Sequence, residues 1–155
     1  MAIRNIVKDG EETLRKKCRP VTVFDKKLAK ILDDMVDTMY RANGVGLAAP
    51  QIGFLRRFVI CEMTDEEIVE IINPEVLEIG SGREILQEGC LSVPGKNCFV
   101  ERPTMLKLRY QNRDGIEVVR TFEGYDARVC CHELDHLDGI LFYDKAVPAP
   151  EGGEA

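Results

Sequence analysis

Two histidines and a glutamate lie within five residues of this chain, in the segment HELDH at positions 132–136. His132 and His136 are the only histidines among 155 residues. On a helix, a spacing of four residues places both imidazoles on one face, one turn apart, where a divalent metal can bind both. Glu133 lies beside them, where its carboxylate can act as general base on a metal-bound water. The segment therefore predicts a metal site with hydrolytic chemistry.

Two imidazoles do not complete a catalytic metal site, which normally has three protein ligands and one open position. Since no third histidine exists, the third ligand must be a cysteine, an aspartate or a glutamate. Cys90 is the leading candidate, because QEGCLSVPG (87–95) is a strand-like stretch punctuated by glycine and proline, and Gly89 allows a close backbone approach. A buried core thiol is the alternative interpretation of Cys90. The other cysteines are expected to be structural or off the metal face: Cys18, Cys61, Cys98, Cys130 and Cys131.

Two helices are predicted, and one of them carries the histidines. That helix covers residues 125–137, with Val129 on the histidine stripe and Gly139 as a natural stop. The other helix begins at the N-cap Asp25 and stops at Gly44. The neighbouring stripe of the histidine helix is apolar and predicts its core face: Ala127, Cys130, Leu134 and Leu137.

The middle of the chain has the composition of β-strands. Strands are expected over residues 58–63, 67–79, 105–111 and 116–122, with Asn-Pro breaking the second and NRDG joining the last two as a hairpin. GVGLAAPQIG (44–53) is expected to be a loop whose backbone comes close to something, neither a strong helix nor a regular strand. The pattern of helix, several antiparallel strands and helix predicts a single α+β domain. The domain is expected over residues 1–147, with a disordered acidic tail over 148–155.

The composition is that of a soluble globular protein, with 45% hydrophobic and 31% charged residues. A net charge of −6 argues against a nucleic-acid-binding surface, which needs clustered lysine and arginine. No apolar run approaches the ~20 residues of a membrane span, and the first residues lack the order of a signal peptide. We therefore expect a cytoplasmic protein without membrane or direct nucleic-acid contact, whose cysteines are thiols or metal ligands rather than disulfides.

Three segments together resemble one family, the peptide deformylases. They are GVGLAAPQ (44–51), EGCLSVP (88–94) and HELDH (132–136), in the family's order. HExxH alone is shared by many zinc peptidases, whereas the three together are highly specific. The resemblance implies the α+β deformylase fold, with antiparallel strands packed around a central HExxH helix. It also implies removal of the N-formyl group from the N-terminal formylmethionine of newly synthesised proteins, releasing formate.

The resemblance also implies a role for each motif residue. Cys90, His132 and His136 match the three metal ligands, and Glu133 matches the general base and acid for a metal-bound hydroxide that attacks the formyl carbon. The implied oxyanion hole consists of the side-chain amide of Gln51, the backbone N–H of Leu91 and the metal. The backbone of Gly46 is expected to contact the extended substrate, which binds like an added strand.

The methionine side chain of the substrate needs an apolar pocket. By position its candidates are Val45, Leu86 and Val129, with Tyr125 and Arg128 near one rim, and each of them suits core packing as well as substrate contact. Gly89 is a further candidate for substrate binding. The metal implied by the resemblance is Fe²⁺ in the cell, with Zn²⁺, Ni²⁺ or Co²⁺ replacing it in preparations. The implied partners are N-formylmethionyl nascent peptides, with transient ribosome contact. Some bacterial members dock through a long C-terminal helix, which is not expected here.

Two other functions fit parts of the sequence. A small zinc endopeptidase would use the same HExxH with another third ligand, and it predicts cleavage of internal peptide bonds. A non-catalytic metal-binding module would close the fourth coordination position with a protein ligand and leave Glu133 without a role. Neither explains GVGLAAPQ or EGCLSVP, which the resemblance to deformylases does.

Overall fold

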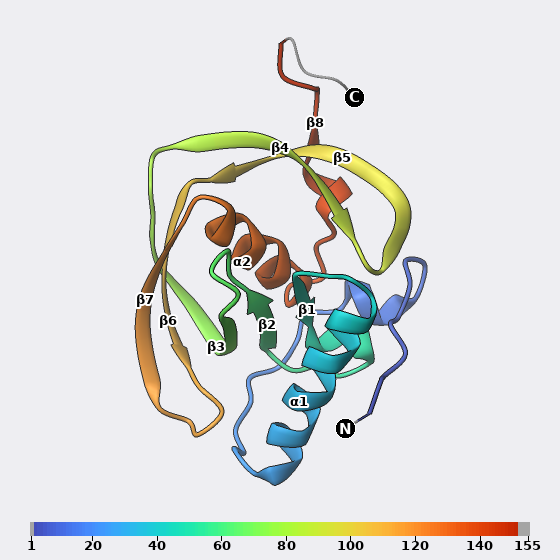
Figure 1. The fold of residues 1–155 in the computed structure, drawn as a ribbon, viewed down its shortest axis with the longest axis vertical. Coiled ribbons are helices and arrows are strands. Elements are labelled where there is room, and N and C mark those ends of the chain that lie inside the picture. The colour runs from blue at the N-terminus through green and yellow to red at the C-terminus, as the bar shows by residue number, and fades with distance from the viewer. Residues whose placement is uncertain (1, 152–155) are drawn as a thin grey trace.

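In the computed structural model, which describes residues 2–151, one helix lies between strands on several sides (Figure 1). This helix is α2 (Tyr125–His136), and it contains His132, Glu133 and His136. It contacts β1, β2, β5 and β7. The second long helix, α1 (Lys26–Arg41), lies on the far side of β1 and β2. The predicted α+β domain with a central HExxH helix is confirmed.

The strands form two antiparallel sheets with the orders β1-β2-β3-β6-β7 and β4-β5-β8. The first contains β1 (Gly46–Ala48), β2 (Phe58–Glu62), β3 (Ile68–Ile79), β6 (Met105–Gln111) and β7 (Glu117–Glu123). The second contains β4 (Arg83–Cys90), β5 (Val93–Pro103) and β8 (Ala146–Val147). Short 3₁₀ turns cover Glu12–Arg15, Ala49–Ile52 and Phe142–Lys145. In Figure 1, β4 and β5 form a curved hairpin that arches over α2.

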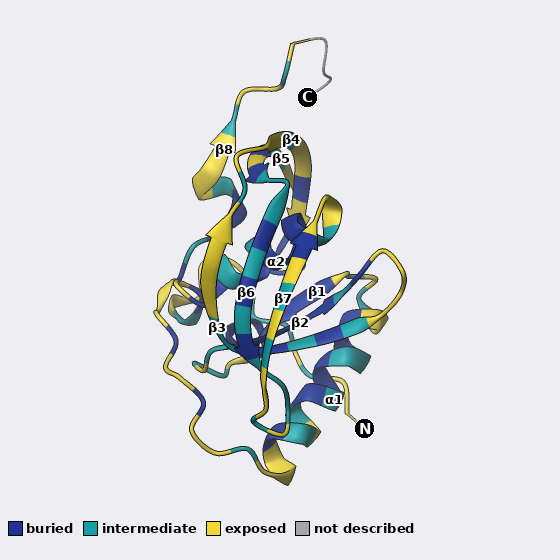
Figure 2. Cartoon of the chain, turned by 90° about the vertical axis from the view of Figure 1, so that its left-hand side faces the viewer, coloured by how far each residue is buried: buried dark blue, intermediate teal, exposed yellow. Residues whose placement is uncertain are grey.

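The strand β2 is buried on both faces, which explains its continuous apolar sequence (Figure 2). Val59 and Cys61 pack with residues of α2, whereas Phe58 and Ile60 pack with residues of α1. This alternation follows from the two-residue period of a strand. The two cores on either side of β2 fix the distance and direction of α2 relative to β1.

The N-terminal helix begins as predicted and ends slightly earlier. Asp25 is the N-cap, and its side chain accepts a hydrogen bond from the Leu28 N–H. The helix ends at Arg41, and Asn43 rather than Gly44 takes the left-handed conformation, with φ of 58°. Asparagine tolerates this conformation better than most residues, so Gly44 has some other reason to be glycine.

The expected break at Asn73-Pro74 is wrong, because β3 continues through it. The register with β6 shifts between Ile72 and Glu75, and Asn73 adopts a φ of 52°. Proline is tolerated at such a bulge, because the pairing with β6 is interrupted between Ile72 and Glu75 and the ladder needs no N–H from Pro74. The Asn73 side chain bonds the backbone N–H and C=O of Val21, which fixes the bulge to the preceding loop.

The segment 44–53 is more regular than predicted, since it contains β1 and a 3₁₀ turn. Gly46 pairs with Cys61 of β2, so long-range pairing gives this small-residue stretch a strand that its composition does not favour. Near the C-terminus the structure assigns no helix or regular strand to residues 148–151, and the remaining part of the predicted tail, 152–155, lies outside the described residues. Between residues 2 and 151, no helix is long and apolar enough to cross a membrane.

The buried carboxylate of Asp34 ties the N-terminal segment to α1. It accepts hydrogen bonds from the backbone N–H of Ala2 and from Arg4 Nε, both at 3.0 Å. These donors favour its ionised form, and the backbone bond to Ala2 is the main reason that the pKa of Asp34 lies below its usual value.

Asp34→Asn is expected to lower the free energy of unfolding by about 1–3 kcal/mol at neutral pH, because a charge-assisted pair is lost. A depressed folded-state pKa stabilises the protein above the unfolded pKa of about 3.9, and this stability is lost as the pH falls through the lower folded value. Thermal unfolding at several pH values would check this. The difference between wild type and variant should narrow below about pH 4, and a constant difference would contradict it.

Candidate active site

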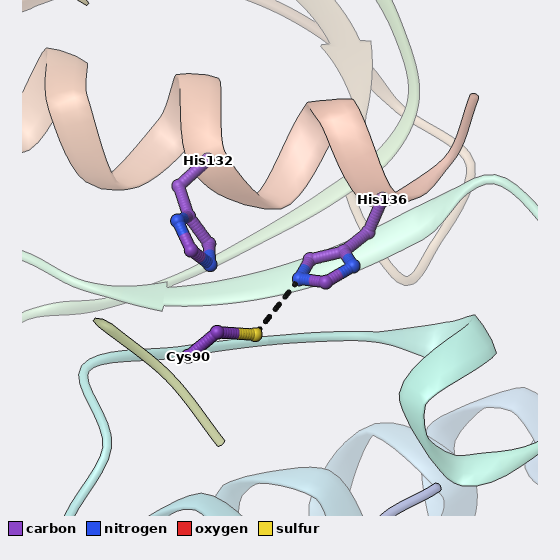
Figure 3. Close-up of side chains that lie close together, drawn as sticks. All are labelled: Cys90, His132 and His136. Carbon is purple, nitrogen blue, oxygen red and sulfur yellow. Dashed lines mark hydrogen bonds between the residues drawn. The ribbon is translucent and has the colours of Figure 1, made fainter. Parts of the chain in front are cut away.

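Cys90, His132 and His136 come together from two distant parts of the chain (Figure 3). Their ligand atoms all lie within 4.8 Å of one another, and Cys90 Sγ lies 3.4 Å from His136 Nε2. A tetrahedral site with usual metal–ligand bond lengths separates sulfur and nitrogen by about 3.6 Å. One thiolate and two imidazoles are also the donors that zinc and iron accept. The arrangement therefore fits a single divalent metal.

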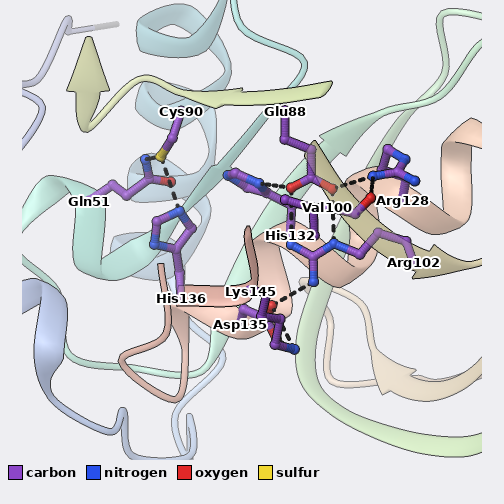
Figure 4. A network of polar contacts seen from close by, with 10 residues as sticks. All are labelled: Gln51, Glu88, Cys90, Val100, Arg102, Arg128, His132, Asp135, His136 and Lys145. Carbon is purple, nitrogen blue, oxygen red and sulfur yellow. Dashed lines mark hydrogen bonds and ion pairs between the residues drawn. The ribbon is translucent and has the colours of Figure 1, made fainter. Parts of the chain in front are cut away.

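Glu88 determines which nitrogen of His132 faces the other two donors (Figure 4). His132 Nδ1 lies 2.9 Å from Glu88 Oε1, so the neutral ring that a metal needs carries its N–H at Nδ1 and has its lone pair on Nε2. Glu88 also accepts two bonds from Arg102, at 2.9 and 3.0 Å, and one from Arg128 at 2.7 Å. Arg102 is held in turn by Asp135 at 2.7 Å. Such partners fix the orientation and tautomer of a metal-binding histidine.

These contacts also determine where charge is stable in the site. Burial opposes ionisation of Glu88, but hydrogen bonds from His132 and Arg102 lower the pKa of its carboxyl to about 2. Burial alone would lower the pKa of His132, whereas its contacts with Cys90 and Glu88 raise that pKa to about 10. Burial and the charge of His132 lower the pKa of His136 to about 3. Cys90 and Glu88 thus stabilise positive charge at the point where the three donors converge.

The Glu133 carboxylate lies against β1 and is nearly inaccessible, with 5% of the residue exposed. Burial raises the pKa of this carboxyl to about 7. Its Oε1 atom is buried and has no hydrogen-bond partner among the described residues. Glu133 nevertheless belongs to the lining of the adjoining cavity. A buried, unpartnered carboxylate beside three metal-type donors is suited to accept a proton.

Gln51 and Ser92 lie on the other side of Cys90. Gln51 Nε2 is 3.6 Å from Cys90 Sγ and donates to Ser92 Oγ at 3.1 Å, while its Oε1 accepts from the Ala48 N–H at 2.9 Å. This bond to Ala48 settles which end of the amide faces the site. Gln51 therefore presents an N–H donor next to Cys90.

A cavity of about 390 Å³ opens in front of these residues. Its lining includes most residues predicted to contact substrate or metal: Val45, Gly46, Gln51, Gly89, Cys90, Leu91, Tyr125, Val129, His132 and Glu133. Leu86 is not in the lining and lies partly exposed on β4. Arg128 lines the cavity but is not a rim residue, since only 3% of it is exposed. It is held by Glu88 and by the carbonyls of Val100 and Glu84, because a buried guanidinium needs partners.

Comparison with known proteins identifies the family. The sequence pattern of the family described as polypeptide deformylase matches residues 3–151. Over 145 residues the chain is 52% identical to peptide deformylase 1 of Clostridium acetobutylicum. The matched region covers 94% of this chain and 95% of that relative. The chain belongs to the peptide deformylase family. Deformylases are metallohydrolases that remove the N-formyl group from N-terminal formylmethionine, so the predicted family and reaction are confirmed.

Solved deformylase structures have the same fold. The crystal structure from Thermotoga maritima superposes with a TM-score of 0.93 at 44% identity, and the match covers 96% of this chain and 100% of that one. A class I type b deformylase from Acinetobacter baumannii, solved with Met-Ala-Ser bound, superposes with a TM-score of 0.87 at 36% identity. That match covers 92% of this chain and 98% of the Acinetobacter chain. The deformylase fold therefore extends over nearly the whole chain.

Sequence reasoning missed the residues that hold the deformylase motifs in place, above all Glu88 and Arg102. A signal for Glu88 was present, because side chains two residues apart on a strand point to the same face, so Glu88 is expected on the face of Cys90. Arg102 gives no such signal. It reaches the site only because β5 folds back on β4, where residue 102 pairs with Glu84.

Glu88→Gln is expected to weaken metal binding by about 10- to 100-fold, because the His132 N–H loses a charged acceptor and two guanidinium groups lose their common partner. Competition with a chromophoric chelator would measure this affinity. Glu84→Gln is the matched control, since Glu84 lies on the same strand and is exposed. Equal metal affinity in the two variants would show that Glu88 does not orient His132.

Proposed function

We propose that Cys90, His132 and His136 bind one divalent metal, and that Glu133 is the general base and acid in deformylation of N-formylmethionyl peptides. The observation that carries this proposal is that the three donors converge on one point, and that Cys90, His132 and the buried Glu133 carboxylate line the adjoining cavity. A divalent metal bound there supplies Lewis acidity and makes water a nucleophile near neutral pH. The side chains assigned to the reaction supply a base and hydrogen-bond donors, and the metal would supply the Lewis acid.

Each remaining step is assigned to a residue of this chain. Glu133 takes a proton from the attacking water and returns it to the leaving amine, so one carboxylate serves both halves of the reaction. The side-chain amide of Gln51 and the backbone N–H of Leu91 stabilise the negative charge that develops on the formyl oxygen. The hydrogen bond from Ala48 supports this role of Gln51, because it holds the amide with Nε2 toward Cys90.

The substrate is proposed to bind as an extended peptide between two edge strands. β1 and β4 each end the order of their sheets, and residues of both line the cavity. A strand edge offers backbone N–H and C=O groups to an added strand, and Gly46 would contribute such a contact. The relative solved with Met-Ala-Ser bound supports an N-terminal methionine peptide as the class of ligand. Its methionine side chain is assigned to Val45 and Val129, which line the cavity, and Gly89 is assigned to contact with the substrate.

The identity of the metal, the cell compartment, the partners and the domain bounds are also proposals. A thiolate with two imidazoles suits both iron and zinc, and we propose Fe²⁺ in the cell, with Zn²⁺, Ni²⁺ or Co²⁺ as replacements. We propose a cytoplasmic enzyme that meets nascent chains during transient ribosome contact, without a nucleic-acid site of its own. The catalytic domain is assigned to residues 1–147 and the tail to 148–155.

A substrate panel distinguishes this proposal from its alternatives. Metal-loaded protein would be incubated with formyl-Met-Ala-Ser, with acetyl-Met-Ala-Ser, and with a longer peptide that has an internal methionine. The proposal predicts formate and free Met-Ala-Ser from the first peptide and intact chains in the other two, as followed by mass spectrometry. Internal cleavage would indicate an endopeptidase, and no reaction with any of the peptides would indicate a metal-binding module.

A further inference from the structure

The two glycines of the GVG segment, Gly44 and Gly46, have no conformational need to be glycine. Neither has a positive φ, and Gly46 is an ordinary strand residue paired with Cys61. Glycine in a strand interior is destabilising. What these two positions require is therefore space rather than a special backbone conformation.

A methyl group at residue 46 would occupy the place of the Glu133 carboxylate. A Cβ built there would overlap Glu133 Oε2 and would lie 2.9 Å from both Cδ and Cγ of the same side chain. Oε2 and Cδ belong to the carboxylate itself, and Cγ is the methylene that carries it, so the overlap can be relieved only by moving the carboxylate away from β1. A Cβ at Gly44 would lie 2.7 Å from Leu91 Cδ1, which is the end of a side chain that can move.

The overlap at residue 46 lies between two elements that cannot easily separate. Gly46 is paired to β2, and α2 packs on both β1 and β2. Glu133 is on α2, directly between the two histidines, so moving it as part of the helix would move them as well. No hydrogen bond holds the Oε1 atom of Glu133 among the described residues. Packing against the Gly46 backbone of β1 is therefore a main determinant of the position of the Glu133 carboxylate.

We infer that Gly46 is a positioning residue for Glu133: its missing side chain is the space in which the general base lies. This inference rests on the proposed role of Glu133. It differs from a backbone contact with substrate, which a residue of any type can provide, because it requires glycine at this position. Gly46→Ala should move the carboxylate or change its rotamer while leaving Cys90 and the backbone edge of β1 available.

The kinetic test compares Gly46→Ala with Gly44→Ala, both loaded with the same metal. For Gly46→Ala, kcat for formyl-Met-Ala-Ser should fall by about 100-fold, since a displacement near 1 Å can have that effect, while KM changes by less than about 3-fold. Gly44→Ala should lose less than about 10-fold in kcat, because Leu91 can move. A Gly46→Ala enzyme that keeps its kcat, or changes only in KM, would overturn the inference.

A stability test separates the steric claim from the catalytic one. Gly46→Ala should lower the melting temperature of the wild-type protein by several degrees. In a protein that already carries Glu133→Ala, the same substitution should lower the melting temperature by clearly less, because the carboxylate that the new methyl group overlaps is absent. If Gly46→Ala alone does not accumulate as folded protein, the double variant should restore it. An equal loss of stability in both backgrounds would overturn the steric claim, even if Glu133 proves to be the general base.

Discussion

Glu133→Gln should retain the metal and the fold while kcat for formate release falls by about 10³-fold or more. The amide has nearly the shape of the carboxylate, so the contact with Gly46 and the packing on β1 remain. It cannot accept a proton at neutral pH, and loss of a general base typically costs 10²- to 10⁴-fold in rate. Steady-state kinetics with formyl-Met-Ala-Ser, together with metal analysis of the same sample, would measure both quantities.

The wild-type protein prepared in parallel is the reference for this variant, since metal content per chain must be equal before rates are compared. KM should change little, because Glu133 is proposed to act on the water and on the leaving amine rather than to hold the peptide. A Glu133→Gln enzyme with more than a tenth of the wild-type kcat at equal metal content would contradict the assignment. The proton would then have to be moved by another group.

Cys90→Ser should lose most of its metal affinity, and its formate release should fall close to background. A serine hydroxyl is protonated at neutral pH and is a harder, weaker ligand than a thiolate, so the site would retain only the two imidazoles of His132 and His136. The side chains have similar size, so the fold should persist. Metal per chain after desalting, melting temperature and formate release would be measured on one preparation.

Cys98→Ser is the matched control for the loss of a thiol. Cys98 lies on β5 opposite Glu88, and it packs against the same small cluster of Val93, Val100 and Phe142 as Cys90 does. It is not among the residues that converge on the metal-type cluster. The control should keep its metal and most of its activity. A Cys90→Ser enzyme as active as Cys98→Ser would show that Cys90 is not the third ligand.

The sequence predicted the elements whose pattern is local. The helix over 125–137, the N-cap Asp25 and the hairpin of β6 and β7 agree with the structure, because each rests on a periodicity or turn signal within a few residues. The proximity of Cys90 to the two histidines is not local. The residues alone made Cys90 one candidate for the third ligand, the resemblance of three motifs to the deformylases implied its role, and the structure brings the three residues together.

The parts that sequence reasoning missed depend on contacts between distant segments. β1 exists because Gly46–Ala48 pairs with β2, against the weak strand propensity of its small residues. Glu88 and Arg102 meet only through the β4–β5 hairpin, and Arg128 is buried because it reaches both strands of that hairpin. The glycines of GVG predicted a close approach, but their neighbours, Leu91 and Glu133, are visible only in the folded chain.

The most direct test of the account is metal-dependent formate release. Protein purified without oxygen would be stripped of metal with a chelator and titrated with Fe²⁺, and formate from formyl-Met-Ala-Ser would be followed at each step. The account predicts background release from the stripped protein and a rate that rises to a plateau at one metal ion per chain. A folded protein that binds one Fe²⁺ per chain and still releases no formate would contradict it.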